Sequence, residues 1–167
     1  MKLIDKSYET ELKLVNKLIK DEIINETVIQ ELYDYIFKKN GKQLRPLLSL
    51  ISSSADKRKN SKRVQVAAII ELLHTATLVH DDVVDESPLR RGVETINNFW
   101  TNSHGVLMGD FIYSKAFMLM VDISNIDILN ELSKATNDIS KGELIQLDLI
   151  GKEDISLNQL KKESYYK

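Results

Sequence analysis

The chain has 167 residues, enough for one domain with a substantial hydrophobic core. Its net charge of -2 excludes a general nucleic-acid-binding surface, which requires an excess of basic residues. It contains no cysteine, which excludes disulfides, thiolate nucleophiles and cysteine-based zinc sites and is typical of a reducing compartment.

The hydrophobic pattern predicts helices nearly throughout, because strict alternation is absent and only two prolines and six glycines interrupt the chain. The first residues lack the apolar centre of a secretory signal, and no apolar run is long enough for a transmembrane span. The predicted helices cover residues 5–20, 27–39, 46–55, 61–86, 104–122, 127–149 and 156–167. We therefore expect a cytoplasmic, all-α protein with one domain over residues 1–167.

Helix boundaries are predicted from residues with special backbone or capping properties. Glycine and asparagine end helices, proline starts or stops them, and serine or aspartate caps their first turn. The boundary residues are Asn40-Gly41 after the second helix, Pro46 near the start of the third, Ser61 before the fourth, Pro88 after it, and Asp154 or Ser156 before the last.

The fourth predicted helix ends in a cluster of carboxylates. Asp81 and Asp85 share a face one turn apart, whereas Asp82 points about 100° away. Two carboxylates at this spacing repel each other, and the C-terminal end of a helix dipole also disfavours negative charge. A divalent cation would remove both costs. Oxygen ligands without cysteine favour magnesium, with manganese as an alternative.

Two arginines follow the acidic helix end. Arg90 and Arg91 can bind phosphate oxygens through their planar forks of donors, so the stretch suits a metal-bound phosphate substrate. The alternative is a solvated, charged helix end with fortuitous pairing. His80 could add a metal ligand, but we favour a packing neighbour, because it points about 100° from Asp81.

A second basic cluster, GKQLRP, precedes the third predicted helix. Lys42 and Arg45 are three residues apart and would lie on one face near a helix N-terminus, which attracts anions. Taken alone, this spacing is common on protein surfaces. Its value depends on whether it lies close to the acidic motif in space.

Together these segments resemble the trans-isoprenyl diphosphate synthases of the polyprenyl synthetase family, and the similarity is close to the octaprenyl diphosphate synthase branch. It covers essentially the whole chain. The segments are GKQLRP, ELLHTATLVHDDVVDESPLRRG, GVLMGDFIYSKAF, KGELIQLD and YYK. The resemblance implies the helical bundle of isoprenoid synthases, here its N-terminal half, and a homodimer.

The resemblance also implies substrates, metal and residue roles. The substrates are isopentenyl diphosphate and an allylic diphosphate, and the cofactor is Mg²⁺, with Mn²⁺ possible. Lys42, Arg45, His74 and Arg91 match isopentenyl diphosphate ligands, Arg90 and Lys167 match allylic diphosphate ligands, and Asp81 and Asp85 match metal ligands, with Asp82 completing the metal motif. Asp81, Asp85, Arg90 and Arg91 are the expected catalytic residues.

In this family, bulky residues four or five positions before the first motif aspartate block the growing product. Those positions hold Thr77 and Ala76, which are small, so the resemblance implies a long-chain product of octaprenyl type. The alternative is that both residues merely let helices pack closely.

Family members are nearly twice as long and carry a second aspartate-rich motif, which this sequence lacks. We therefore expect an N-terminal portion that is inactive alone. Two alternatives remain: a short non-catalytic subunit that regulates a full-length prenyl synthase, and a class I terpene cyclase. GKQLRP argues against the cyclase, which has no isopentenyl diphosphate to bind.

Overall fold

The computed structural model describes residues 6–23, 26–37, 41–55, 62–152 and 154–166. The chain divides into two compact units, Met1–Ile123 and Ser124–Lys167, each described separately below. The expected all-α fold is confirmed: within the described residues, helices dominate and one small hairpin is the only sheet. Among the helices so described, none is long and apolar enough to cross a membrane.

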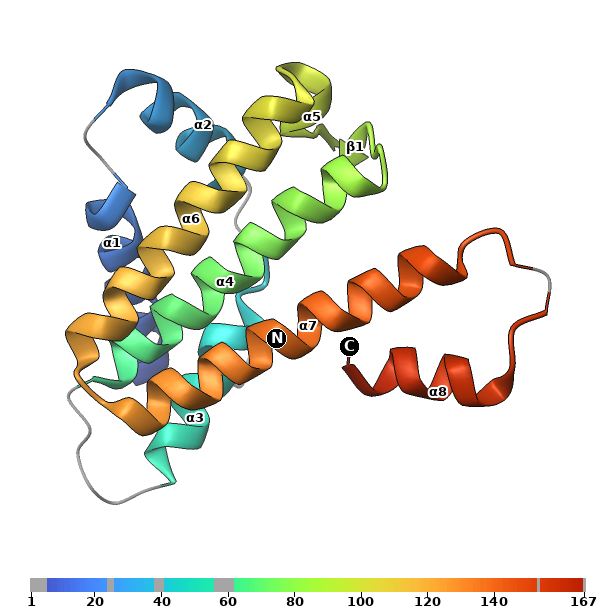
Figure 1. The fold of residues 1–167 in the computed structure, drawn as a ribbon. Coiled ribbons are helices and arrows are strands. Elements are labelled where there is room, and N and C mark those ends of the chain that lie inside the picture. The colour runs from blue at the N-terminus through green and yellow to red at the C-terminus, as the bar shows by residue number, and fades with distance from the viewer. Residues whose placement is uncertain (1–5, 24–25, 38–40, 56–61, 153, 167) are drawn as a thin grey trace. The chain divides into compact units, whose positions relative to one another are not determined.

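The first unit is a helical bundle built around two long helices. Its elements are α1 (Lys6–Ile23), α2 (Thr27–Phe37), α3 (Leu44–Ser54), α4 (Arg63–Val84), β1 (Leu89–Arg90), β2 (Val93–Glu94), α5 (Ile96–Phe99) and α6 (Asn102–Ile123). Helices α4 and α6 lie side by side along much of their length, and α1 and α3 pack against α4 (Figure 1).

Small residues allow α4 and α6 to approach closely. Gly105 of α6 lies against the Val83 side chain, and Gly109 lies against the His80 ring, where an added Cβ would collide with either neighbour. The fully buried side chains around this contact include Ile69 and Leu72 from α4 and Ile112, Met120 and Ile123 from α6. Burial of these apolar surfaces holds the acidic end of α4 on a rigid support.

The chain leaves α4 through a tight C-terminal turn. Ser87 N donates to Asp82 O at 3.0 Å and Glu86 N donates to Val83 O at 3.3 Å, the paired bonds of a Schellman motif. Glu86 takes the left-handed conformation that glycine usually provides, with φ +49°. The helix therefore ends before Pro88, and the turn rather than the proline reverses the chain.

The reversed chain forms the hairpin of β1 and β2, which the sequence pattern did not predict. Leu89 pairs with Glu94 and Arg90 with Val93, so Arg91 and Gly92 form a two-residue loop. Their φ angles of +54° and +74° match a type I′ turn. Tyr35 of α2 donates its hydroxyl to Glu94 O at 3.0 Å, which fastens the hairpin to the bundle.

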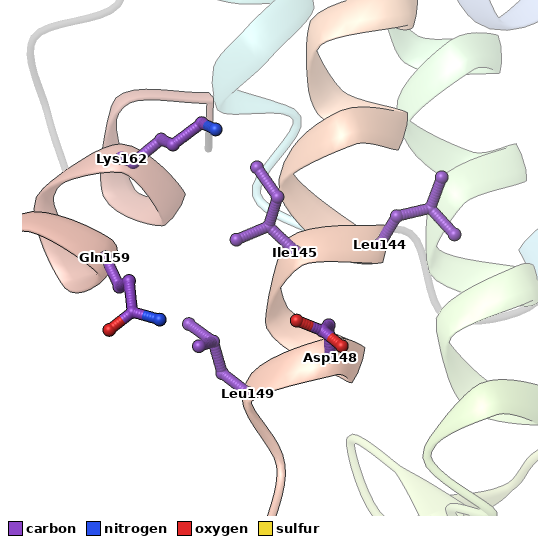
Figure 2. Close-up of a pocket in the computed structure, with 6 residues that line it drawn as sticks. All are labelled: Leu144, Ile145, Asp148, Leu149, Gln159 and Lys162. Carbon is purple, nitrogen blue, oxygen red and sulfur yellow. The ribbon is translucent and has the colours of Figure 1, made fainter. Parts of the chain in front are cut away.

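The second unit is a pair of helices, α7 (Ile126–Leu149) and α8 (Leu157–Tyr166). The Asn125 side chain caps α7 by accepting from Asp127 N and Ile128 N. The predicted cap at Ser156 is confirmed, since Gln159 N donates to Ser156 Oγ and Ser156 N donates to Gln159 Oε1. Figure 2 shows the open hollow between the two helices, lined by Leu144, Ile145, Asp148, Leu149, Gln159 and Lys162.

The predicted helices correspond to α1–α4 and α6–α8, with boundaries shifted by a few residues. Short α5 was missed together with the hairpin, because four-residue elements carry too little periodicity. Pro46 lies in the first turn of α3, as expected, although the helix begins at Leu44. The predictions for Asn40 and Ser61 fall outside the described residues. Gly41 is not among the described glycines with positive φ, and the prediction that the Asn40-Gly41 pair ends the second helix stays a prediction, since Asn40 lies outside the described residues.

Candidate functional site

The acidic end of α4 presents three carboxylates in two different environments. Asp81 is partly exposed and Asp85, the C-cap residue, is exposed, whereas Asp82 retains only 7% of its surface. Asp85 N donates to Asp81 O at 2.8 Å, so the helical spacing extends through Asp85. The predicted shared turn of Asp81 and Asp85 is therefore present, with Asp82 set into the protein.

Asp82 forms an ion pair with Arg90 of β1. The Nε atom of Arg90 donates to both carboxylate oxygens of Asp82, at 2.8 and 2.9 Å. Burial raises the pKa of the Asp82 carboxyl; the hydrogen bonds and charge of Arg90 oppose the rise, and Asp85 adds to it. The pair links the end of α4 to the hairpin.

Arg91, at the tip of the hairpin, lies against Gly41. A Cβ placed on Gly41 would lie 2.9 Å from Arg91 Cζ and still closer to Arg91 Nη1, so any larger residue here would displace this guanidinium. The adjacent loop is held by paired amides, in which Asn16 Nδ2 donates to Gln43 Oε1 at 3.2 Å. The structure thus brings GKQLRP and the arginine pair together, which spacing alone could not establish.

Arg45 of α3 reaches His74 of α4, with 3.0 Å between Arg45 Nη1 and His74 Nε2. Burial, followed by the positive charges of Arg45, Arg91 and Arg90, lowers the pKa of His74 to about 4. His74 is therefore neutral near pH 7, and its Nε2 can accept the hydrogen bond from Arg45.

Glu71, one turn before His74 on α4, was not identified from the sequence. Burial raises the pKa of its carboxyl, while the charges of Arg45 and Arg91 lower it. Glu71 thus supplies negative charge beside two clustered arginines. Its position three residues before His74 was the available signal, but glutamate on a helix is too common to single out.

Strained backbone gathers around this cluster. Among the described residues, four that are not glycine have positive φ: Gln43, Glu86, Arg91 and Ser124. The first three lie in the loop before α3, the turn after α4 and the hairpin tip, which are the segments that carry the candidate site. Non-glycine residues in this conformation cost about 1–2 kcal/mol each and concentrate at functional sites.

The other residues predicted for the site differ in exposure and in the contacts that they make. Lys42 is exposed beside Gly41, and Thr77 is partly exposed with its hydroxyl donating to His74 O at 2.8 Å. Ala76 is completely buried, which fits the packing alternative at that position. His80 packs on Gly109, with Nε2 3.2 Å from Val106 O and 3.3 Å from Asp110 Oδ1. Lys167 falls outside the described residues.

The donor set suits a magnesium ion that is completed by substrate. Within the described residues, no three histidine or carboxylate side chains gather into a closed metal cage. Asp81 and Asp85 on one turn provide the one or two carboxylates that magnesium usually takes, with water and phosphate oxygens filling its octahedron. Arginines at the same helix end can bind those phosphates.

Comparisons with known proteins agree with this arrangement. Residues 26–167 match the family model described as Polyprenyl synthetase. The all-trans-nonaprenyl-diphosphate synthase (geranyl-diphosphate specific) of Rhodobacter capsulatus is 45% identical over 134 residues, covering 76% of this chain and 41% of that protein. The octaprenyl diphosphate synthase of Escherichia coli (strain K12) is 40% identical over 143 residues, covering 85% of this chain and 44% of that protein.

Among solved structures, the polyprenyl synthase of Caulobacter crescentus CB15, complexed with calcium and isoprenyl diphosphate, superimposes with a TM-score of 0.89. It is 34% identical, and the match covers 95% of this chain and 48% of that one. The fold is thus the helical fold of isoprenoid synthases. The chain belongs to the polyprenyl synthetase family, and it spans less than half the length of the two curated relatives described above.

Proposed function

We propose that the chain is the N-terminal part of a long-chain trans-polyprenyl diphosphate synthase. The complete enzyme condenses isopentenyl diphosphate with an allylic diphosphate. The names of the nonaprenyl and octaprenyl relatives support a long product. The chain alone is expected to be inactive, because the family's second aspartate-rich motif is absent from its sequence.

One observation carries the proposal: three segments that are distant in sequence converge at one side of α4. Arg91 lies on Gly41, Arg45 contacts His74, and Arg90 pairs with Asp82. Arginines brought together in this way repel one another, and the two carboxylates beside them, Asp82 and Glu71, leave part of their positive charge for an external anion. A solvated surface patch would not require such convergence, so a phosphate-bearing ligand explains the arrangement better.

The two substrates would occupy opposite ends of this cluster. His74 lies seven residues before Asp81, or about 10 Å along the helix. We assign Lys42, Arg45, His74 and Arg91 to isopentenyl diphosphate, and Arg90 with Lys167 to the allylic diphosphate. Asp81 and Asp85 would hold magnesium next to the allylic diphosphate.

Leaving-group departure is the step that these residues would assist. Bound magnesium supplies Lewis-acid neutralisation of the departing diphosphate. Arg90 donates hydrogen bonds to the charge that develops on the same group, which lowers the barrier to the allylic cation. Arg45 and Arg91 hold isopentenyl diphosphate so that its double bond attacks that cation. No nucleophilic side chain is required.

The proposal also covers the length of the product and the assembly of the protein into a homodimer. Thr77 is small and partly exposed, so it leaves room for a growing chain four residues before Asp81. A homodimer is supported by apolar side chains on α6 that are at least half exposed and would gain from being covered: Leu107, Met118 and Val121.

The experiment is to read the coding sequence past Lys167 and to assay its complete product with labelled isopentenyl diphosphate, an allylic primer and Mg²⁺. A frame that continues into a second aspartate-rich motif, and a product that forms long polyprenyl chains, would support the proposal. A complete product that consumes no isopentenyl diphosphate would contradict it. A stop codon directly after Lys167, with a synthase that co-purifies, would favour the short-subunit alternative.

A further inference from the structure

We infer that Asp82 is a positioning residue, which holds the guanidinium of Arg90 in the orientation that binds diphosphate. This role rests on the proposed function, because it concerns how the same site presents its arginine to diphosphate.

The Asp82 carboxylate is already hydrogen-bonded and is buried. Both of its oxygens accept from Arg90 Nε, at 2.8 and 2.9 Å, and the residue is 93% removed from solvent, with 7% of its surface exposed. A metal ion at this position would compete with the arginine for a buried carboxylate, and loss of the arginine would leave that carboxylate without its positive partner. Asp85 is exposed and has no such constraint.

Arg90 uses only part of its donor set on Asp82. Within the described residues, the hydrogen bonds recorded for the Arg90 guanidinium use Nε alone. Its two terminal nitrogens form one of the edges through which a guanidinium binds phosphate oxygens in a bidentate fashion. Holding Nε therefore fixes the plane of the guanidinium while its phosphate-binding edge stays unused.

Asp82 lies where α4 turns into the hairpin. Its backbone oxygen accepts from Ser87 N in the Schellman turn, and its side chain accepts from Arg90, eight residues further along the chain. The side chain of Asp82 thus contacts the first strand of the hairpin directly after the turn that closes the helix. Any change that releases the Arg90 side chain from Asp82 should increase its rotamer freedom and weaken diphosphate binding.

The test uses the 167-residue chain, inorganic diphosphate and Mn²⁺ as probes. The Arg90 Nε–H resonance is assigned by its loss in Arg90→Gln, and its exchange with water is measured. In the unchanged chain we expect slow exchange, which Asp82→Asn should accelerate and the matched change Asp85→Asn should not. Fast exchange in the unchanged chain would overturn the pairing. If Arg90→Gln does not fold, Arg90→Lys provides the assignment, since it also lacks this resonance and keeps the positive charge.

Diphosphate titrations then test the role itself. Asp82→Asn should weaken diphosphate binding by about tenfold or more, the scale of one charge-assisted hydrogen bond. In the Arg90→Gln background, Asp82→Asn should cause no further loss of diphosphate binding. Asp82→Asn should keep the fold-enhancement of binding by Mn²⁺, whereas Asp85→Asn should lose it. Loss of the enhancement in Asp82→Asn would overturn the inference and make Asp82 a metal ligand.

A failure of the proposed function would give a different result from a failure of the inference about Asp82. If the unchanged chain binds no diphosphate with or without Mn²⁺, the proposed function of this site is overturned, and the diphosphate role of Asp82 falls with it. The Asp82–Arg90 pairing is still decided by the exchange of the Arg90 Nε–H resonance. Additive losses in the double variant, with diphosphate binding intact, would overturn only the positioning role.

Discussion

His74 Nε2 and Arg45 Nη1 lie 3.0 Å apart, and this pair joins α3 to the middle of α4. A guanidinium is always charged, so the pair persists only while the imidazole is neutral. Burial lowers the pKa of His74 to about 4, and the charge of Arg45, followed by those of Arg91 and Arg90, adds to this shift.

The titration of His74 is the first prediction. Because the folded-state pKa of about 4 lies below the ordinary value of 6.5, the unfolded chain binds the proton first as pH falls. Stability from this residue is thus present above pH 6.5 and is lost as pH falls toward 4. Denaturation curves across this range should show a smaller acid dependence for His74→Gln. In NMR titrations, Arg45→Gln should raise the pKa of His74, and an unchanged pKa would contradict the electrostatic explanation.

Gly41→Ala should displace the guanidinium of Arg91 from its position against Gly41. The new Cβ would collide with the guanidinium, so the arginine must move, and isopentenyl diphosphate binding should weaken by about 10-fold to 100-fold. Calorimetric titration measures the change. In an Arg91→Ala background, the same Gly41→Ala substitution should have no further effect. An equal loss in both backgrounds would show that Gly41 acts without Arg91.

Glu86→Gly should stabilise the protein by about 1 kcal/mol, because glycine adopts the left-handed conformation at φ +49° without the steric cost. The matched control is Asp85→Gly, one residue earlier, where φ is -82° and glycine should instead destabilise by about 0.5–1 kcal/mol. Urea unfolding compares the two. Glu86→Gln retains the strained backbone and separates its cost from the effect of charge.

Gly109→Ala should destabilise the contact between α4 and α6. The added methyl meets the His80 ring, with His80 Cε1 at 3.0 Å and other ring atoms closer, so helices or side chains must shift. Overpacking of this kind costs about 1–3 kcal/mol. Ser114→Ala on the exposed side of α6 is the control and should change the unfolding midpoint little. Equal midpoints for both variants would argue against the close packing.

If the proposed function holds, Thr77→Phe should shorten the main product of the complete protein, because a ring at this position would obstruct the growing chain. Chromatography of the products made from labelled isopentenyl diphosphate measures this. Ala76→Leu is the contrasting change: Ala76 is 0% exposed, so a larger side chain should destabilise by about 1–3 kcal/mol. An unchanged product with Thr77→Phe would remove Thr77 from chain-length control.

The helical periodicity predicted the long helices and the shared turn of Asp81 and Asp85, because both depend on a spacing visible in the residues. It could not predict that Arg90 returns to Asp82. That return needs left-handed backbone at Glu86 and Arg91, and neither residue type signals it. The approach of Arg91 to Gly41 was equally hidden, since it joins segments fifty residues apart through tertiary packing.

The left-handed backbone at Arg91 places stability and ligand binding in opposition at one residue. A type I′ turn is built most favourably from asparagine and glycine, so Arg91→Asn would make a better hairpin while removing the guanidinium that rests on Gly41. Selection for thermal stability alone would therefore favour the replacement of Arg91, and selection for substrate binding would favour its retention. A thermostabilised form of the protein should be designed with Arg91 left in place and the adjustment made at Glu86 instead.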